Sequence, residues 1–468
     1  MKRVSFFLIL TTTLFLSYSC TRATRPIREE AQKNPVVQEI MNEIQEDSND
    51  AAVTNTNLPG SPKPTQTLHV FIENSGSMNG YINNASDFQM AVGRAIQLMK
   101  FRYDQENIKT YYINTKVSER VRPDGTDLYA FVQEMLERKE FTKTGGTAST
   151  DLNDIVKKVL SYVDENNTAI LISDFIYSLP STKGVTTSLL YGCQNLTMSA
   201  FLEKTKEMPK GVSLATNLVQ LYSYFDGHYW HWEKPTGKDY VSLKCSRPYY
   251  LCILGTDNNV REINSDKGIV IQDLKGYKNQ FTISNKDVSR ANYTVFDTKY
   301  KKGTYKHSTN QDEPIHAITH AKANNVNEFE LGVAIDLSDF SMSETDKLDK
   351  ANYEVFGNYR IVSIEEINVA KLTSPIDKKL IEKYHCTHAI VLACTGFPND
   401  FSISIKRGLP QWVLQSSSTD DRNIRDDESE QAKTFGLSYF VEGIADAYKH
   451  LDKDKNNFMT MNVSVKCK

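Results

Sequence analysis

The sequence lacks the signatures of several large functional classes. Its 468 residues carry a formal net charge of only −3, so no excess of basic residues favours nucleic-acid binding. No nucleotide-binding glycine loop, His-Glu-x-x-His zinc motif or Ser-His-Asp order is present. No carboxylate pair has a placement that points to polymer hydrolysis. These absences argue against a nucleic-acid-binding protein and against an enzyme.

Cysteines and long apolar runs are also scarce. Seven cysteines occur, and no segment beyond the N-terminus reaches the roughly 20 apolar residues of a membrane-spanning helix. Setting aside Cys20 leaves an even number, which permits disulfides in an oxidising compartment. Cys252 and Cys394 lie in apolar runs, where buried free thiols fit equally well. The disulfide pattern therefore stays open.

The first 20 residues have the pattern of an export signal. A basic dipeptide precedes an apolar stretch from Val4 to Leu16, which is too short to span a bilayer. Leu16-Ser17-Tyr18-Ser19-Cys20 then resembles the lipobox of bacterial lipoproteins, in which the cysteine is lipidated. The resemblance implies an acyl anchor at Cys20. Tyr18 departs from the small residues usual there, and an ordinary secretory signal is the alternative.

Residues 21–66 are polar and end in a proline-rich stretch, which predicts a flexible tether. Basic residues directly after Cys20 favour the periplasmic face of the outer membrane over surface export. A tether of this kind would hold the folded part of the chain away from the lipid.

Residues 67–257 alternate between strand and helix patterns. The expected strands include Leu68–Ile72, Ile108–Ile113 and Ala169–Ser173. The expected helices include Phe88–Met99, Leu128–Leu136 and Asp151–Val163. This alternation predicts an α/β domain with a doubly wound, mostly parallel sheet.

From residue 258 to residue 468 the sequence consists mainly of strand-like runs separated by polar turns. This pattern predicts a β-rich, sandwich-like second domain. The expected strands are Gly268–Gln272, Gln280–Ser284, Phe329–Ile335, Tyr359–Ile364, Ala389–Ala393 and Phe401–Ile405. Apolar residues recur at helical spacing from Phe435 to Leu451, which predicts a C-terminal helix in this domain.

Three polar segments follow predicted strands or precede a predicted helix. Glu73-Asn74-Ser75-Gly76-Ser77 follows the first strand, Gly145-Gly146-Thr147 precedes a helix, and Asp174 follows the strand Ala169–Ser173. Open α/β sheets place ligand sites at such strand ends. Together the segments resemble the metal-ion-dependent adhesion site of von Willebrand factor A-type domains. That site uses Asp-x-Ser-x-Ser, a threonine and a distal aspartate.

In this comparison Ser75, Ser77, Thr147 and Asp174 match the family pattern, and Glu73 stands where the family has its first aspartate. The resemblance covers residues 67–257 and implies a site for Mg²⁺ or Mn²⁺ made of these five residues. Hydroxyl and carboxylate oxygens are suitable ligands for such hard cations. In the family, a carboxylate of a partner protein completes the coordination of the metal.

Glu73 leaves several interpretations open. Its longer side chain can replace a metal-bound water and contact the ion, or it can distort or neutralise the site. In a degenerate site, Ser75, Ser77 and Thr147 would only satisfy loop backbone groups, and Asp174 would cap a helix.

Other segments predict structure rather than chemistry. The aromatic run Tyr222–Trp232 predicts a hairpin that turns at Asp226-Gly227, with a binding platform as the alternative. His385-Cys386-Thr387-His388 lacks a second ligand pair for zinc and predicts a strand edge. The charged segment Asp420–Glu430 predicts a solvated loop.

The leading functional expectation is a membrane-anchored module that binds an acidic residue of another envelope or extracellular protein through a bound metal. The alternatives are an enzyme that acts on envelope polymers, with the A-type domain as docking support, and a structural envelope protein with a degenerate metal site.

Overall fold

The computed structural model describes residues 66–83, 86–143, 151–177, 186–230, 240–307, 312–340, 342, 344–451 and 456–467. The expected signal peptide with Cys20, and the expected tether up to residue 65, lie outside these residues, as does Thr147. None of the described helices is both long enough and apolar enough to cross a membrane.

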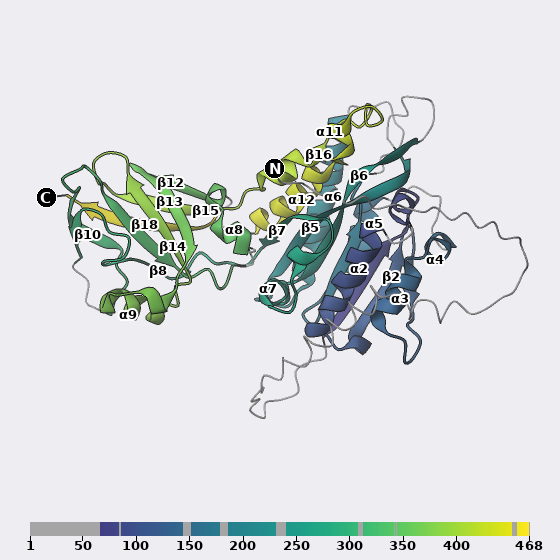
Figure 1. Cartoon of the computed structure of the whole chain (residues 1–468), viewed down its shortest axis with the longest axis horizontal. Coiled ribbons are helices and arrows are strands. Elements are labelled where there is room, and N and C mark those ends of the chain that lie inside the picture. Colours follow the sequence, from purple (N-terminus) through teal and green to yellow (C-terminus); the bar gives the residue numbers. More distant parts are fainter. Residues whose placement is uncertain are drawn as a thin grey trace, which may run out of the picture. The chain divides into compact units, whose positions relative to one another are not determined.

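The larger sheet has seven strands in the order β3-β2-β1-β4-β6-β5-β7 (Figure 1). Their bounds are β1 Thr67–Glu73, β2 Ile108–Ile113, β3 Val117–Arg120, β4 Asn167–Ser173, β5 Leu214–Tyr229, β6 Val241–Thr256 and β7 Tyr277–Ser284. β1 pairs in parallel with β2 and β4, and the other pairings of this sheet are antiparallel. β6 is antiparallel to both β4 and β5, so β4 and β5 point in the same direction. Most strands therefore share one direction, within a mixed sheet.

Both faces of this sheet are buried. Along β1, Val70 and Ile72 contribute to one hydrophobic core, whereas Phe71 between them contributes to the other. Alternate side chains of a strand point to opposite faces, so a continuous apolar run serves two cores at once. The mixed α/β architecture with helices on both faces follows from this pattern.

Helices cover each face. On the face of Val70 and Ile72 lie α2 (Asp87–Leu98), α3 (Leu128–Met135) and α7 (Asp257–Ser265). On the face of Phe71 lie α5 (Leu152–Leu160), α6 (Thr186–Glu207) and α12 (Leu437–His450). α2 begins with a capping box in which Ser86 and Gln89 exchange hydrogen bonds. The helices and strands expected between residues 67 and 177 are present in the structure.

The strands β5 and β6 form a hairpin that is sixteen residues long on each side. Asp226 and Gly227 lie inside the ladder, which continues to the pair Tyr229–Val241. The expected turn at Asp226-Gly227 is therefore wrong, although the hairpin itself is present. Gly227 serves another purpose, because a Cβ atom there would lie 2.6 Å from the Cα atom of Gly80. The glycine of the Asp226-Gly227 pair therefore reflects a close approach of two backbones and not a turn.

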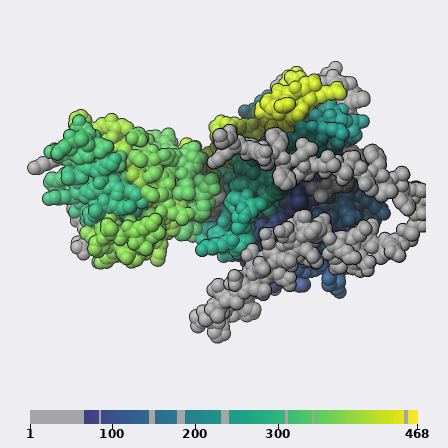
Figure 2. All heavy atoms as spheres, viewed as in Figure 1, coloured from purple at the N-terminus to yellow at the C-terminus, as the bar shows by residue number. Residues whose placement is uncertain are grey.

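The expected boundary at 257/258 does not separate the hydrophobic cores. β7 pairs with β5 in the larger sheet, and α12 packs against α6. Figure 2 shows the yellow residues of the C-terminal region against the teal residues of the first half. Helical periodicity predicted α12 correctly, but it carries no information on which sheet the helix covers. The C-terminal helix thus belongs to the α/β part rather than to the β-rich part.

The β-rich part contains two further sheets, in the orders β12-β15-β18-β10-β9 and β13-β14-β11-β8. Their bounds are β8 Tyr293–Val295, β9 Thr304–Lys306, β10 Ala317–Lys322, β11 Glu330–Ile335, β12 Tyr353–Phe356, β13 Tyr359–Glu366, β14 His388–Cys394, β15 Phe401–Lys406 and β18 Asn457–Lys466. Side chains from both sheets form one core, for example Val333 of β11 and Ile403 of β15. This is the packing of a sandwich.

The described residues also form five further α-helices and two strands of two residues each. They are α4 Arg138–Lys143, α8 Glu344–Leu348, α9 Pro375–Lys383, α10 Gln411–Gln415, β16 Ser417–Ser418, α11 Glu428–Gln431 and β17 Thr434–Phe435. The strand expected at Gly268–Gln272 is wrong, since a 3-10 turn at Ile271–Asp273 lies there. Its apolar residues Ile269 and Ile271 are buried in the core of the larger sheet without strand pairing. No disulfide joins the six described cysteines.

Candidate metal-binding site

The parallel register of β1 and β4 places two polar residues side by side at the end of the sheet. Ile72 pairs with Ile172, so Glu73 and Ser173 follow at the same level. The Ser173 hydroxyl donates a hydrogen bond to the Glu73 carboxylate at 2.5 Å. Asp174 comes next in the chain. Buried strands that end in polar residues thus bring two carboxylates to one edge.

The serines of the first segment join the two carboxylates. The Oγ atoms of Ser75 and Ser77 lie 3.1 Å apart. Ser75 is hydrogen-bonded to the carboxylate of Glu73, and Ser77 to that of Asp174. The structure therefore brings together four of the five residues predicted for the metal site. We call Glu73, Ser75, Ser77 and Asp174 the carboxylate–serine cluster.

Asn74 fixes the loop that carries the serines. Its backbone N–H donates to the carbonyl of Ile113 at 3.0 Å, and its side-chain amide donates to the carbonyl of Phe141 at 3.2 Å. Asn114 in turn donates to the Asn74 side-chain oxygen at 2.8 Å. The loop is thereby tied to the end of β2 and to α4, which holds the serine hydroxyls in place.

The chain turns sharply after Asp174. Phe175 has φ 54°, in the left-handed region, where a non-glycine residue costs roughly 1–2 kcal/mol. Its ring packs against Tyr250 and Phe440 with centroid distances of 5.7 and 5.0 Å. Ile176 N–H donates to the Asp174 carboxylate at 3.3 Å. Residues 175–177 are not helical, so Asp174 caps this turn and not a helix, contrary to the degenerate-site interpretation.

Both carboxylates are buried, with exposures of 5% for Glu73 and 3% for Asp174. Burial, together with repulsion from Asp174, raises the pKa of Glu73 to about 7. Burial also raises the pKa of Asp174, against the opposing effects of the Ser77 hydrogen bond and the charge of Arg247. Two buried carboxylates in mutual repulsion favour either a proton or a cation between them.

Arg247 is a buried residue beside the cluster that the sequence analysis did not predict. It lies in β6, is 1% exposed, and donates to the carbonyls of Gln431 and Lys433 at 2.9 and 3.2 Å. Its guanidinium lies 4.6 Å from the centroid of the Tyr229 ring and attracts Asp174. The pattern of residues in this strand does indicate that Arg247 is buried. Arg247 stands in the alternating series of Val241, Leu243 and Tyr249, whose side chains are buried.

The segment Asp420–Glu430 takes part in this arrangement. Asp421 is 2% exposed and accepts a hydrogen bond from the Tyr229 hydroxyl at 3.0 Å. Ile424 is buried in the core of the larger sheet. The expectation of a merely solvated loop is wrong here, because its charge-rich composition hid two buried residues.

A tryptophan side chain covers the serine loop. A Cβ atom on Gly76 would lie 3.2 Å from the indole Nε1 of Trp230. Within the described residues this Nε1 atom is buried and has no hydrogen-bond partner. A buried N–H donor without an acceptor is costly. Its position next to Gly76, the residue between Ser75 and Ser77, makes it a candidate donor to a ligand of the cluster.

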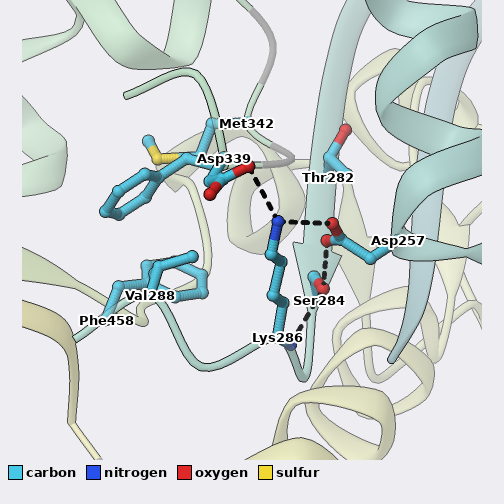
Figure 3. Close-up of a pocket in the computed structure, with 9 residues that line it drawn as sticks. Asp257, Thr282, Ser284, Lys286, Val288, Asp339, Met342 and Phe458 are labelled. Atoms are coloured by element: carbon cyan, nitrogen blue, oxygen red, sulfur yellow. Dashed lines mark hydrogen bonds and ion pairs between the residues drawn. The ribbon is translucent and has the colours of Figure 1, made fainter. Parts of the chain in front are cut away.

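A hollow at another place in the fold is lined by charged and apolar side chains, and the charged ones among the described residues are paired. Lys286 lies within it and places its Nζ atom 3.0 Å from Asp339 and 3.7 Å from Asp257 (Figure 3). Ser284 donates to Asp257 at 2.6 Å. The charges of this hollow are therefore already paired.

Comparisons of the chain with protein-family models, with curated proteins and with solved structures give no match.

Proposed function

We propose that the chain is a membrane-anchored protein-binding module. Its α/β part holds Mg²⁺ or Mn²⁺ in the carboxylate–serine cluster and presents the ion to an acidic side chain of an envelope or extracellular partner. The observation that carries this proposal is the buried pair of Glu73 and Asp174, joined through Ser75 and Ser77. Such oxygens are ligands that hard divalent cations prefer.

The charges support a metal that remains able to attract a partner. Ionised Glu73 and Asp174, set against Arg247, leave one negative charge in the cluster. A divalent cation would turn this into one positive charge, because the serine hydroxyls are neutral. The low dielectric of a buried site strengthens the attraction for an incoming carboxylate. The Trp230 indole N–H would donate to that carboxylate.

The anchoring half of the proposal rests on the sequence. An acylated Cys20 and the polar stretch to residue 66 would hold the module at the periplasmic face of the outer membrane. The von Willebrand factor A-type resemblance of residues 67–257 is part of the same proposal. In its favour are the parallel strands β2, β1 and β4 and the cluster at their carboxyl ends.

One observation favours a second candidate, a structural envelope protein without a metal. Arg247 already attracts Asp174, and a proton on Glu73 would remove the remaining charge. In that case the cluster is a satisfied polar element of the domain. The two candidates differ in their response to cations.

The test is thermal unfolding of the full chain in chelator, Mg²⁺ and Mn²⁺. Binding to the native state stabilises it by about 2.7 kcal/mol at a hundredfold excess over the dissociation constant. We expect both cations to raise the melting temperature of the wild type and of Glu165→Gln, an exposed control. Asp174→Asn should abolish the rise. No response in either wild type or Glu73→Asp would overturn the metal site.

Partner capture is tested separately. Tagged protein is incubated with solubilised envelope in Mg²⁺ or in chelator, and retained proteins are compared. We expect a partner retained only with the metal, and lost with Asp174→Asn. Equal retention in chelator would contradict the metal bridge, even if the cluster itself binds the ion.

A further inference from the structure

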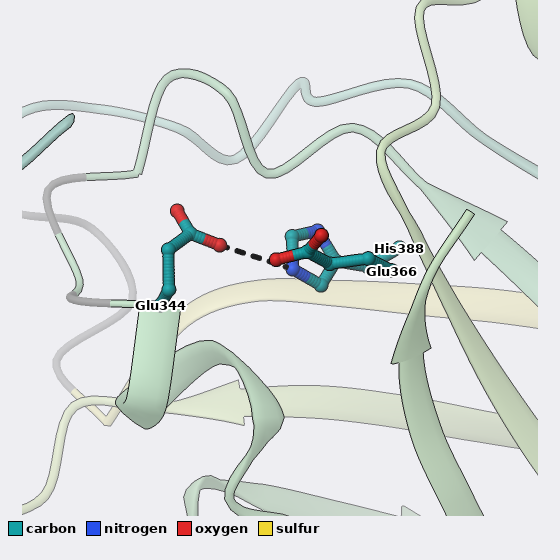
Figure 4. Close-up of side chains that lie close together, drawn as sticks. All are labelled: Glu344, Glu366 and His388. Carbon is teal, nitrogen blue, oxygen red and sulfur yellow. Dashed lines mark ion pairs between the residues drawn. The ribbon is translucent and has the colours of Figure 1, made fainter. Parts of the chain in front are cut away.

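A second cluster of ligand-type side chains lies in the sandwich, on its four-stranded sheet. It consists of Glu344 from α8, Glu366 from β13 and His388 from β14 (Figure 4). Glu366 and His388 are direct partners across the β13–β14 ladder. One ligand atom of each residue lies within 4.8 Å of the others. We call these residues the His–Glu–Glu cluster.

His388 lies at the N-terminal end of a strand, as its sequence surroundings predicted. It begins β14, an interior strand that pairs with β13 on one side and β11 on the other. Its side chain is therefore buried, with 3% of the residue exposed. The other ligand-type side chains of the cluster belong to residues 44 and 22 positions earlier in the chain, Glu344 and Glu366, which a local motif cannot reveal.

The imidazole of His388 points to a ligand. Its Nε2 atom is buried and has no hydrogen-bond partner within the described residues. An oxygen of Glu344 lies 3.5 Å away, a long distance for a hydrogen bond but an ion-pair distance when the imidazole is protonated. Nδ1 lies 2.9 Å from the hydroxyl of Thr387. If Nδ1–H donates to Thr387, the Nε2 lone pair faces the carboxylates of Glu344 and Glu366.

Both glutamates can serve as ligands. Lys347 lies 2.7 Å from one oxygen of Glu344, and the other oxygen faces His388. Both glutamates are exposed, so their side chains can draw together around an ion. Metal–ligand bonds of about 2.0–2.1 Å can form once these side chains have moved together.

We propose that Glu344, Glu366 and His388 bind a divalent transition metal, with Zn²⁺ as the best fit. One imidazole nitrogen and two carboxylate oxygens suit Zn²⁺ better than Mg²⁺, which prefers oxygen alone. Three protein ligands leave a position for water or for an external donor. The Thr387 hydroxyl acts as the outer-shell partner that orients the histidine. The ion would tie α8 to β13 and β14.

The experiment is calorimetric titration of metal-free full-length protein with Zn²⁺ at neutral pH. We expect one site that is lost, or weakened at least tenfold, in Glu344→Gln/Glu366→Gln. Glu354→Gln/Glu382→Gln, which changes two exposed glutamates elsewhere in the sandwich, should bind like wild type. The Glu344/Glu366 variant keeps the buried His388 and so protects the fold, which circular dichroism checks. Unchanged binding in that variant, or none in wild type, would overturn the site.

Cobalt substitution identifies the ligands. Co²⁺ in a histidine–carboxylate site gives d–d bands without thiolate charge transfer, and these bands should vanish in Glu344→Gln/Glu366→Gln. A thiolate band would instead assign the metal to one of the free cysteines and contradict the proposal. Asp174→Asn should leave the Co²⁺ spectrum unchanged, because that residue belongs to the other cluster.

Discussion

The Ser173 hydroxyl donates to the Glu73 carboxylate across 100 positions of the sequence and also accepts from the N–H of Phe175. One side chain thus joins the ends of β1 and β4 to the turn that places Asp174. The carboxylate–serine cluster depends on this contact as much as on its own members.

Ser173→Ala should destabilise the protein by about 1–3 kcal/mol, because it leaves buried hydrogen-bonding groups of Glu73 and Phe175 without a partner. It should also raise the pKa of Glu73 further, since the lost hydrogen bond lowers that pKa. Urea unfolding measures the first effect. Ser161→Ala, at an exposed hydroxyl, is the control and should change stability little. Equal losses in both variants would contradict the role of Ser173.

The stability of the metal-free protein should fall as pH rises from about 4.5 to about 7. Glu73 has a folded-state pKa of about 7 against an ordinary value of 4.5, so the native state keeps a proton that the unfolded chain releases. Its contribution is complete below the lower value and is lost as pH passes the higher one. At about 1.4 kcal/mol per pKa unit, the loss is about 3 kcal/mol.

The check is the difference between wild type and Glu73→Gln in unfolding free energy across this pH range. That difference should vary with pH, whereas wild type minus Glu165→Gln should stay flat. Saturating Mg²⁺ should weaken the pH dependence, because metal binding displaces the proton. Parallel curves for wild type and Glu73→Gln would show that Glu73 titrates normally.

Glu73→Asp should keep or strengthen Mg²⁺ and Mn²⁺ binding. The shorter carboxylate restores the motif of A-type domains, although it gives up the present hydrogen bond from Ser173. A larger metal-induced rise in melting temperature than in wild type is the expected result. A rise that disappears in Glu73→Asp but not in wild type would mean that the longer side chain is itself a required ligand.

Arg247→Met should destabilise the metal-free protein by about 3–5 kcal/mol, because Asp174 loses a buried cation. Mg²⁺ should recover part of this loss, since the ion supplies positive charge at the same place. Urea unfolding with and without Mg²⁺ measures the recovery. Lys244→Met, which removes an exposed ion pair on the same strand, should change the stability little. A loss in Arg247→Met that Mg²⁺ does not reduce would favour the structural candidate.

Cys20→Ser should move the protein from the membrane fraction to the soluble envelope fraction. The acyl chains supply the membrane affinity, at about 0.8 kcal/mol per buried methylene. Fractionation followed by immunoblotting is the measurement. Continued membrane association of the variant would contradict lipid anchoring.

The sequence predicted this cluster because each of its polar segments directly follows a recognisable strand and together they resemble a known motif. Strands β1 and β4 are apolar runs that end in polar residues, and parallel pairing brings such ends together. The role of Arg247 was not predicted because its partner carbonyls, at Gln431 and Lys433, lie about 185 residues away in the sequence. The His–Glu–Glu cluster was not predicted for the same reason, because its residues come from a helix and two strands that lie apart in the sequence. Periodicity predicts an element, but not its neighbours.

The long-range ties of Arg247 also govern when the site can form. Residues 67–257 contain every member of the carboxylate–serine cluster. The apolar cover for Phe175, however, comes from α12 and β17. The carbonyls that accept hydrogen bonds from Arg247 belong to Gln431 and Lys433, just before β17. A chain that stops near residue 257 would leave that face open to water and Arg247 unsatisfied. The surroundings of the cluster are therefore complete only when the C-terminal region packs against the first sheet. A truncated product would carry the motif without these surroundings.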